Sequence, residues 1–209
     1  MSGIAENLGK VADRIEAACA RAGRDPATVE LIAVSKTCPV DSLREAVDAG
    51  QLQFGESKLQ EAECKITLLP SHVRWHFIGR LQRNKVRKLL PQFAVIHAID
   101  SFRIAAFTDE VARESGLFPK VFLQVNVGGE VSKGGFEPDE LRSEIGGLLA
   151  LKRLETMGLM CIPPAGSNAE AARPWFIMLR NLRDELEADN GVFLPFLSMG
   201  MSDDYEVAI

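Results

Sequence analysis

The sequence has few of the features that mark membrane, secreted or metal-binding proteins. No apolar run approaches the roughly 18 residues that a membrane-spanning helix needs. Residues 1–23 carry acidic side chains early and have no continuous apolar core, which argues against a signal peptide. The four cysteines include no CxxC pair, and the three histidines show no HExxH spacing. We therefore expect a cytoplasmic protein with reduced thiols, no metal site and no membrane contact.

Signals for nucleotide and nucleic-acid binding are also missing. No G-x-G-x-x-G follows the first predicted strand, so a dinucleotide-binding fold lacks its main signal. The net charge of −5 argues against broad binding to nucleic acid. One segment, residues 80–90, is rich in Lys and Arg. A solvated helix face is the favoured interpretation of this segment, and an anion-binding surface is the alternative.

The composition that remains, 46% hydrophobic and 25% charged over 209 residues, is typical of globular proteins. Short apolar runs rich in β-branched residues alternate with amphipathic runs bounded by Gly, Pro or Ser. The predicted strands are 31–36, 52–55, 74–79, 93–100, 120–127, 154–162 and 193–200. The predicted helices are 4–22, 42–50, 58–69, 80–90, 102–116, 138–151, 169–191 and 202–209.

This alternation predicts an α/β fold. Strands that are apolar on both faces and alternate with helices form a parallel sheet covered by helices. Seven such units in series favour a (β/α)8 TIM-type barrel with an extra N-terminal helix, 4–22, over an open doubly wound sheet. No linker or low-complexity tract interrupts the chain, so we expect one domain, 1–209. An eight-stranded barrel needs one more strand and helix, and we expect this chain to lack that last unit.

Lys36 closes the apolar run LIAVSK and is the first candidate for chemistry. A charged ammonium costs several kcal/mol to desolvate unless it is paired, neutralised or used covalently. Lysine is also the side chain that forms Schiff bases when burial lowers its pKa. The alternative is a strand-end lysine whose stem packs and whose charged head reaches water.

In a barrel of this kind the C-terminal ends of the strands meet at one mouth. The predicted strands bring Lys36, His76, Asn126 and the loop SMGMS (198–202) to that mouth. Gly200 would let the loop backbone approach a ligand, and N–H groups at a following helix start favour an anion. A phosphate anchor opposite a Schiff-base lysine is what pyridoxal 5′-phosphate (PLP) requires. Each feature has a plainer alternative. The loop could be only a helix cap, His76 could be a core histidine, and Asn126 could cap the end of its strand.

Longer motifs carry a family resemblance. The stretches AVSKTCP, FGESKLQEA, WHFIGRLQRNK and LSMGMSDDYEVAI occur between residue 33 and the C-terminus. The chain therefore resembles the YggS/PROSC (PLPBP) family of PLP homeostasis proteins, whose barrel is similar to the N-terminal domain of bacterial alanine racemase. The resemblance implies PLP held as a Schiff base on Lys36. It further implies a set of cofactor-binding residues around it: His76, Asn126, Ser198, Met199 and Gly200.

Two departures from the family pattern stand out. Family members often carry Asn in an FGEN motif, where this chain has Ser57. The family also continues with a glycine-rich strand whose arginine faces the pyridine nitrogen, and that segment is not found within residues 1–209.

The resemblance implies a monomer that controls intracellular PLP (vitamin B6) pools without catalysis and that has PLP-dependent apoenzymes as possible partners. An alanine-racemase-like enzyme acting on amino acids is the main alternative. It needs two bases on opposite faces of the substrate, and the one tyrosine, Tyr205, lies on the last predicted helix. A Schiff-base aldolase is a third possibility, with Glu56 or Asp100 as the acid–base group.

Overall fold

The computed structural model describes residues 3–130, 133–166 and 168–209. Within these ranges seven strands form one sheet in chain order, and every neighbouring pair is parallel. The strands are β1 (Ala33–Val34), β2 (Gln53–Glu56), β3 (Arg74–Phe77), β4 (Val95–Ile99), β5 (Lys120–Gln124), β6 (Glu155–Met160) and β7 (Phe196–Ser198).

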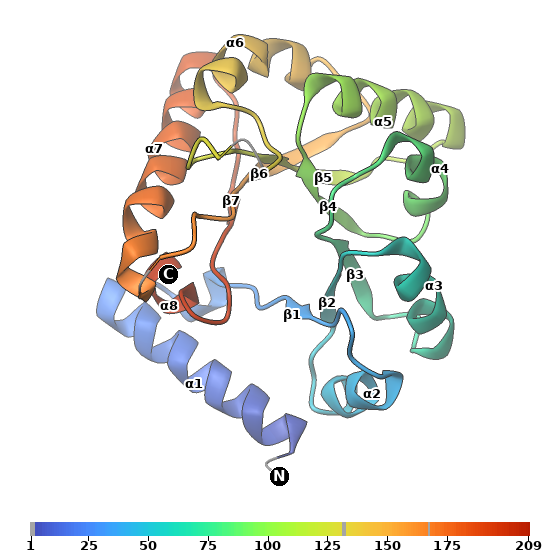
Figure 1. The fold of residues 1–209 in the computed structure, drawn as a ribbon, viewed down its shortest axis with the longest axis vertical. Coiled ribbons are helices and arrows are strands. Elements are labelled where there is room, and N and C mark those ends of the chain that lie inside the picture. Colours follow the sequence, from blue (N-terminus) through green and yellow to red (C-terminus); the bar gives the residue numbers. More distant parts are fainter. Residues whose placement is uncertain (1–2, 131–132, 167) are drawn as a thin grey trace.

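Helices cover the outside of this sheet (Figure 1). They are α1 (Ile4–Ala22), α2 (Val40–Asp48), α3 (Leu59–Leu68), α4 (Val86–Leu89), α5 (Phe102–Ser115), α6 (Pro138–Leu149), α7 (Arg173–Asn190) and α8 (Tyr205–Ala208). The predicted α/β class and the extra N-terminal helix are confirmed.

The sheet is strongly curled, as expected for a TIM-type fold (Figure 1). Ser198 Oγ on β7 lies 2.7 Å from His97 Nδ1 on β4. Neighbouring strands are about 4.8 Å apart, so a flat sheet would separate these strands by about 14 Å. The direct contact requires the interior face of the sheet to close on itself, and β1 and β7 remain as its two edges.

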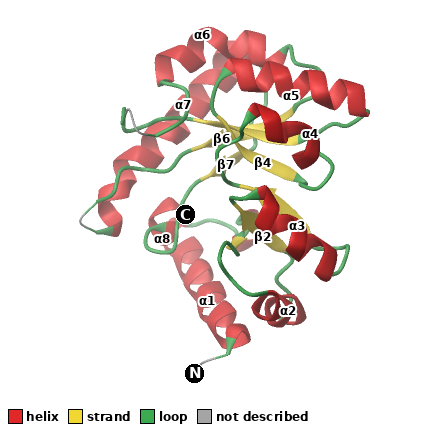
Figure 2. Cartoon of the chain, turned by 45° about the vertical axis from the view of Figure 1, so that its right-hand side comes forward, coloured by secondary structure: helices red, strands yellow, loops and turns green. Residues whose placement is uncertain are grey.

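The two ends of the chain hold each other on the outside of this curl. Glu206 on α8 accepts from Arg14 at 2.6 Å and from Arg21 at 3.0 Å, both on α1. Both views show α8 beside α1 (Figures 1 and 2). This contact joins the segment before the first strand to the segment after the last.

Local sequence signals explain where several helices begin and end. Gly23, in the left-handed conformation at φ +64°, ends α1. Glu137 and Glu140 form a capping box at the start of α6. Pro174 lies in the first turn of α7, where its missing N–H has no cost. The central strands are buried on both faces, as their apolar runs predict.

Several boundaries differ from the prediction, and three are instructive. The strand expected over 31–36 shrinks to Ala33–Val34, because an edge strand has a ladder partner on one side only. The helix expected over 80–90 is a 3-10 turn followed by the four residues of α4. The last helix begins at Tyr205 rather than after Ser202, because the Asp204 carboxylate accepts from Met201 N at 2.6 Å and closes the intervening turn.

No helix in the described ranges is long and apolar enough to cross a membrane. The same residues contain no group of three or more His, Cys, Asp or Glu side chains that could hold a metal ion.

Candidate functional site

Lys36 lies just past the C-terminal end of β1, in a turn, and its side chain is exposed. This corrects the expectation of a lysine at the end of a buried strand. Val34 is half-exposed for the same reason, since β1 is an edge strand. The next residue, Thr37, has φ +65° and is the one non-glycine residue with a left-handed backbone in the part of the chain described. Lys36 is therefore followed by a tight and conformationally restricted turn.

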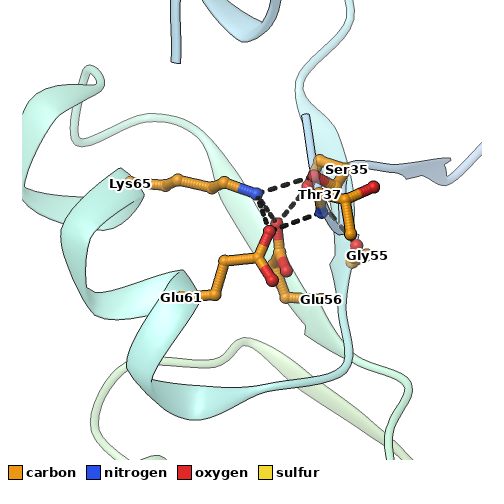
Figure 3. A network of polar contacts seen from close by, with 6 residues as sticks. All are labelled: Ser35, Thr37, Gly55, Glu56, Glu61 and Lys65. Atoms are coloured by element: carbon orange, nitrogen blue, oxygen red, sulfur yellow. Dashed lines mark hydrogen bonds and ion pairs between the residues drawn. The ribbon is translucent and has the colours of Figure 1, made fainter. Parts of the chain in front are cut away.

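A network around Lys65 of α3 holds the backbone on both sides of Lys36 (Figure 3). Lys65 Nζ donates to the carbonyl of Ser35 at 2.7 Å, to Glu56 Oε1 at 2.7 Å and to Glu61 Oε1 at 2.6 Å. Glu61 in turn accepts from the backbone N–H of Thr37. We call Ser35, Thr37, Glu56, Glu61 and Lys65 the Lys65 network.

The Lys65 network is a buried charged cluster. The side chains of Lys65 and Glu56 are 5% and 0% exposed. Burial alone would lower the pKa of Lys65, and the hydrogen bonds to Glu56 and Glu61 outweigh it, so its pKa is raised. The hydrogen bond from Lys65 lowers the pKa of Glu61, helped by the Thr37 amide. Lys65 and Glu61 are therefore both charged at neutral pH.

The network also decides the role of Glu56. Ser35 Oγ donates to Glu56 Oε1 at 2.7 Å, and the same carboxylate oxygen accepts from Lys65 of α3 (Figure 3). Lys36 lies past the end of β1, and its amine makes no hydrogen bond or ion pair with this cluster within the described residues. Glu56 is thus bound to Lys65 behind the strand and is not the acid–base group beside Lys36 that an aldolase needs.

The loop after β7 has the character of an anion site. Gly200 has φ +88°, and a Cβ there would lie 2.9 Å from Tyr205 Cα, so the tight turn requires glycine. The backbone N–H groups of Met199 and Gly200 have no hydrogen-bond acceptor within the residues described. Because α8 starts only at Tyr205, these donors come from the loop itself and not from the helix N-terminus that the sequence predicts.

Inside the curled sheet, His76 of β3 is joined to Ser198 through a residue that the sequence analysis did not assign, His97 of β4. Ser198 Oγ lies 2.7 Å from His97 Nδ1, and His97 Nε2 lies 2.9 Å from His76 Nδ1. His76 Nε2 lies 2.8 Å from Gln53 Oε1 on β2. We call this row, Ser198–His97–His76–Gln53, the histidine relay.

Both histidines of the relay are deeply buried, with exposures of 4% for His76 and 1% for His97. Burial, with a smaller effect of Arg74, lowers the pKa of His76 to about 4. Burial, with a smaller effect of His76, lowers the pKa of His97 to about 3. Both rings are neutral at neutral pH, and His97 is also held by stacking on Phe122, at 4.7 Å between ring centroids.

Asn126 lies in a different part of the mouth. Its Nδ2 donates to the carbonyl of Glu130 at 3.2 Å and to Glu137 Oε1 at 2.9 Å, which ties down the loop before α6. It also lines a cavity of about 280 Å³, together with Arg80, Asp100 and six other residues, but Lys36 and Ser198 do not line it. Cofactor binding by Asn126 stays a prediction.

The residues present fit a ligand with an aldehyde and a phosphate. Lys36 supplies an amine without a hydrogen-bond or ion-pair partner among the described residues. The loop at Met199 and Gly200 supplies backbone donors without acceptors, and Ser198 supplies a hydroxyl. An amine that can condense with an aldehyde and a loop that can bind an anion are the two groups that PLP needs.

Comparison with known proteins agrees with this chemistry. The family model for the alanine racemase N-terminal domain matches residues 7–208. A pyridoxal phosphate homeostasis protein from Pseudomonas aeruginosa is 46% identical over 213 residues, covering 100% of this chain and 90% of that protein. One of the same name from Aquifex aeolicus is 43% identical over 205 residues, covering 98% of this chain and 90% of that protein.

Solved structures show the same relationship. PipY from Synechococcus elongatus, solved with PLP bound, is 39% identical, with a TM-score of 0.81, and the match covers 95% of this chain and 92% of PipY. An alanine racemase from Clostridium difficile has a TM-score of 0.66 at 12% identity, over 88% of this chain and 50% of the racemase. The second likeness concerns the fold alone.

Proposed function

The chain belongs to the pyridoxal phosphate homeostasis protein family, within the wider alanine racemase N-terminal domain family, and from this we propose that it binds PLP and serves intracellular vitamin B6 homeostasis without catalysing a reaction. The observation that carries the proposal is the similarity over almost the whole chain to a structure with PLP bound. The free amine of Lys36 and the unpartnered loop amides support it.

Each predicted residue has a role in this proposal. Lys36 would hold the aldehyde end of PLP through its amine, and Ser198 with the amides of Met199 and Gly200 would hold the phosphate. His76 does not contact the phosphate in this proposal; it hydrogen-bonds to His97, which in turn hydrogen-bonds to Ser198. Asn126 keeps the loop before α6 in place at the rim of the mouth. The Lys65 network fixes the backbone from which Lys36 projects.

The direct test is spectroscopic. Protein mixed with PLP should absorb in the visible region as an imine does, and borohydride reduction should leave a mass increase on the peptide that contains Lys36. Lys36→Ala should lose both signals. Lys152→Ala, which removes another exposed lysine, should keep them. Retention of the imine absorbance by Lys36→Ala would refute the assignment of the lysine.

A racemase activity is the weaker proposal. Tyr205, its candidate second base, packs against α1, where the guanidinium carbon of Arg14 lies 5.1 Å from the centroid of its ring. Its hydroxyl is buried there without a hydrogen-bond partner among the described residues. A tyrosine enclosed between α1 and α8 is poorly placed to exchange a proton with a substrate. Incubation with L-alanine in deuterated water tests this: deuterium at Cα would show that the protein is an enzyme.

We further propose a cytoplasmic monomer that delivers PLP to PLP-dependent apoenzymes. Light scattering in solution tests the oligomeric state. Activation of a PLP-free transaminase by the loaded protein, measured against an equal amount of free PLP, tests delivery. Activation no faster than free PLP can account for would contradict it.

A further inference from the structure

The histidine relay has a property that a simple buried hydrogen bond lacks: its direction is not fixed. A neutral imidazole carries one N–H and one bare nitrogen, so it donates on one side and accepts on the other. Two neutral rings in a row must therefore point the same way, since the opposite choice places two hydrogens or two lone pairs face to face. At 2.9 Å between His76 Nδ1 and His97 Nε2, either nitrogen can be the donor, but one must donate and the other must accept.

In the first arrangement the relay runs toward Gln53. Ser198 donates its hydroxyl hydrogen to His97 Nδ1, His97 donates from Nε2 to His76 Nδ1, and His76 donates from Nε2 to Gln53 Oε1. Every group is satisfied, but the hydroxyl hydrogen of Ser198 is used inside the protein. Ser198 can then only accept from a ligand.

In the second arrangement the relay runs toward Ser198. The side-chain amide of Gln53 turns over and donates to His76 Nε2, His76 donates from Nδ1 to His97 Nε2, and His97 donates from Nδ1 to Ser198 Oγ. The hydroxyl hydrogen of Ser198 is then free to point into the mouth. Gln53 is only half-buried, and its Nε2 makes no hydrogen bond within the described ranges, so little resists its rotation.

A phosphate dianion offers acceptors only, so Ser198 can bind it only by donating. We propose that His97 and His76 are positioning residues for Ser198, and that a phosphate dianion bound at Ser198–Gly200 selects the second arrangement and reverses the relay as far as Gln53. The inference rests on the phosphate site of the proposed function. It adds a specificity: the site favours a doubly charged phosphate over an uncharged or singly protonated group.

The reversal conserves atoms and charge. Each ring keeps one hydrogen, which moves from Nε2 to Nδ1. The Ser198 hydroxyl hydrogen passes to His97 Nδ1, and Ser198 regains one from water in the mouth, or from a protonated phosphate. His97 passes its Nε2 hydrogen to His76 Nδ1, and the hydrogen on His76 Nε2 leaves to water at the Gln53 end. When water is the donor to Ser198, the hydroxide it leaves is neutralised by this released proton through the solvent. No ring becomes charged at the end points, which the depth of burial of both histidines requires.

Nitrogen-15 NMR of the full chain with labelled histidine tests this, because the two nitrogens of a neutral imidazole resonate differently with and without hydrogen. Addition of PLP should move the hydrogen of His97 and His76 from Nε2 to Nδ1. Pyridoxal, which has the aldehyde but no phosphate, should leave both rings unchanged. His72 is exposed and outside the relay, so its signals serve as the internal control.

A variant separates transmission through Ser198 from a general effect of binding. Ser198→Ala removes the link but keeps the histidine pair, and PLP should no longer change either tautomer. His97→Phe should reduce the preference for PLP over pyridoxal by about tenfold, which corresponds to one charged hydrogen bond of ordinary strength. If His97→Phe does not fold, the tautomer measurement on Ser198→Ala still decides the matter.

The outcomes distinguish this inference from the function on which it rests. If borohydride fixes PLP on Lys36 but the tautomers of His76 and His97 do not change, the relay inference is wrong and PLP binding stands. A change that persists in Ser198→Ala also overturns it. If no PLP binds under any condition, both proposals fail together.

Discussion

The Lys65 network and the histidine relay lie on opposite faces of the same sheet and reach the two predicted ends of the cofactor. The Lys65 network lies between β2 and α3 and holds the backbone around Lys36 (Figure 3). The relay crosses the interior and ends at Ser198. The first is made of full charges and the second of neutral groups.

This difference in charge gives the two networks different capacities. An ammonium can only donate and carboxylates can only accept, so the hydrogen bonds of the Lys65 network have one possible direction. Such a network can hold a backbone but cannot rearrange. The neutral imidazoles and hydroxyl can exchange donor and acceptor roles without creating charge. We infer that the lysine end of the site is rigidly anchored and that the phosphate end is adjustable.

The largest expected effect comes from removing the cation of the Lys65 network. Lys65→Met leaves Glu56 buried without its partner, and we expect the free energy of unfolding to fall by about 3–5 kcal/mol, measured by urea denaturation. Lys10 offers a matched control, because it pairs with Glu6 at 2.6 Å, as Lys65 does with Glu61, but at the surface. Lys10→Met should cost about 0.5 kcal/mol or less.

A second substitution shows where that loss arises. Adding Glu56→Gln to Lys65→Met removes the stranded carboxylate charge, so part of the lost stability should return. If the double variant is no more stable than Lys65→Met, the cost is one of packing, and the contrast between the two networks loses its electrostatic basis.

The relay should appear in the pH dependence of stability. The folded pKa values of about 4 and about 3 lie below the ordinary histidine value of 6.5, so the unfolded chain binds the protons more tightly. The relay's contribution is complete above pH 6.5 and is lost as pH falls toward 4. Between pH 6 and 5, stability should fall by about 2.4 kcal/mol per pH unit, since nearly two protons are taken up on unfolding.

His97→Gln tests the assignment of those protons. It removes one of the two titrating histidines, and the slope should be smaller by about 1.2 kcal/mol per pH unit. The lowered pKa values of Glu61 and other glutamates also contribute near pH 5, but equally in both proteins, so the difference between the two slopes reports His97. A slope that is the same in the variant would mean that His97 is not buried as a neutral ring.

A smaller effect is expected at the rim of the Lys65 network. Glu61→Gln keeps an acceptor for the Thr37 amide but loses the charge facing Lys65. Because Glu61 is partly exposed, the free energy of unfolding should fall by only about 1 kcal/mol. A loss as large as that in Lys65→Met would mean that Glu61, rather than Glu56, is the partner of Lys65 that contributes most to stability.

The smallest change concerns the turn after Lys36. Thr37→Gly removes the strain of a β-branched residue at φ +65° but adds flexibility to the unfolded chain. The two effects should leave stability within about 1 kcal/mol of the original, with faster hydrogen exchange at the residue 37 amide. A larger loss would show that the threonine side chain itself holds the turn.

The sequence was sufficient for the parts of the molecule that depend on local pattern. Apolar runs and capping residues predicted the central strands and most helices, while a shared site for Lys36 and Ser198 stays a prediction. The exposure of Lys36 was not predictable from LIAVSK, because the same apolar run suits a central strand and an edge strand. Burial at that position depends on a neighbouring strand and not on the run itself.

The two networks were missed for a related reason. Lys65 follows Glu61 by four residues, which is usual for a solvated helix face, and only the packing of α3 on β2 buries it. His97 and Ser198 are 101 positions apart, and nothing local to either indicates the other. The one available signal was a histidine in an otherwise apolar strand, and this signal does not indicate which residue the histidine contacts.

The contact between α1 and α8 has a consequence for the order in which the protein folds. Arg14 and Glu206 are separated by 192 positions, so bringing them together closes a loop that is nearly the whole chain. For a flexible chain, the length-dependent part of this closure costs about 4–5 kcal/mol of entropy. During synthesis α1 can pack on the nearby α2 early, but its ion pairs with α8 must wait until Glu206 has been made. We expect the contact between α1 and α8 to form late in folding and to be lost early in unfolding.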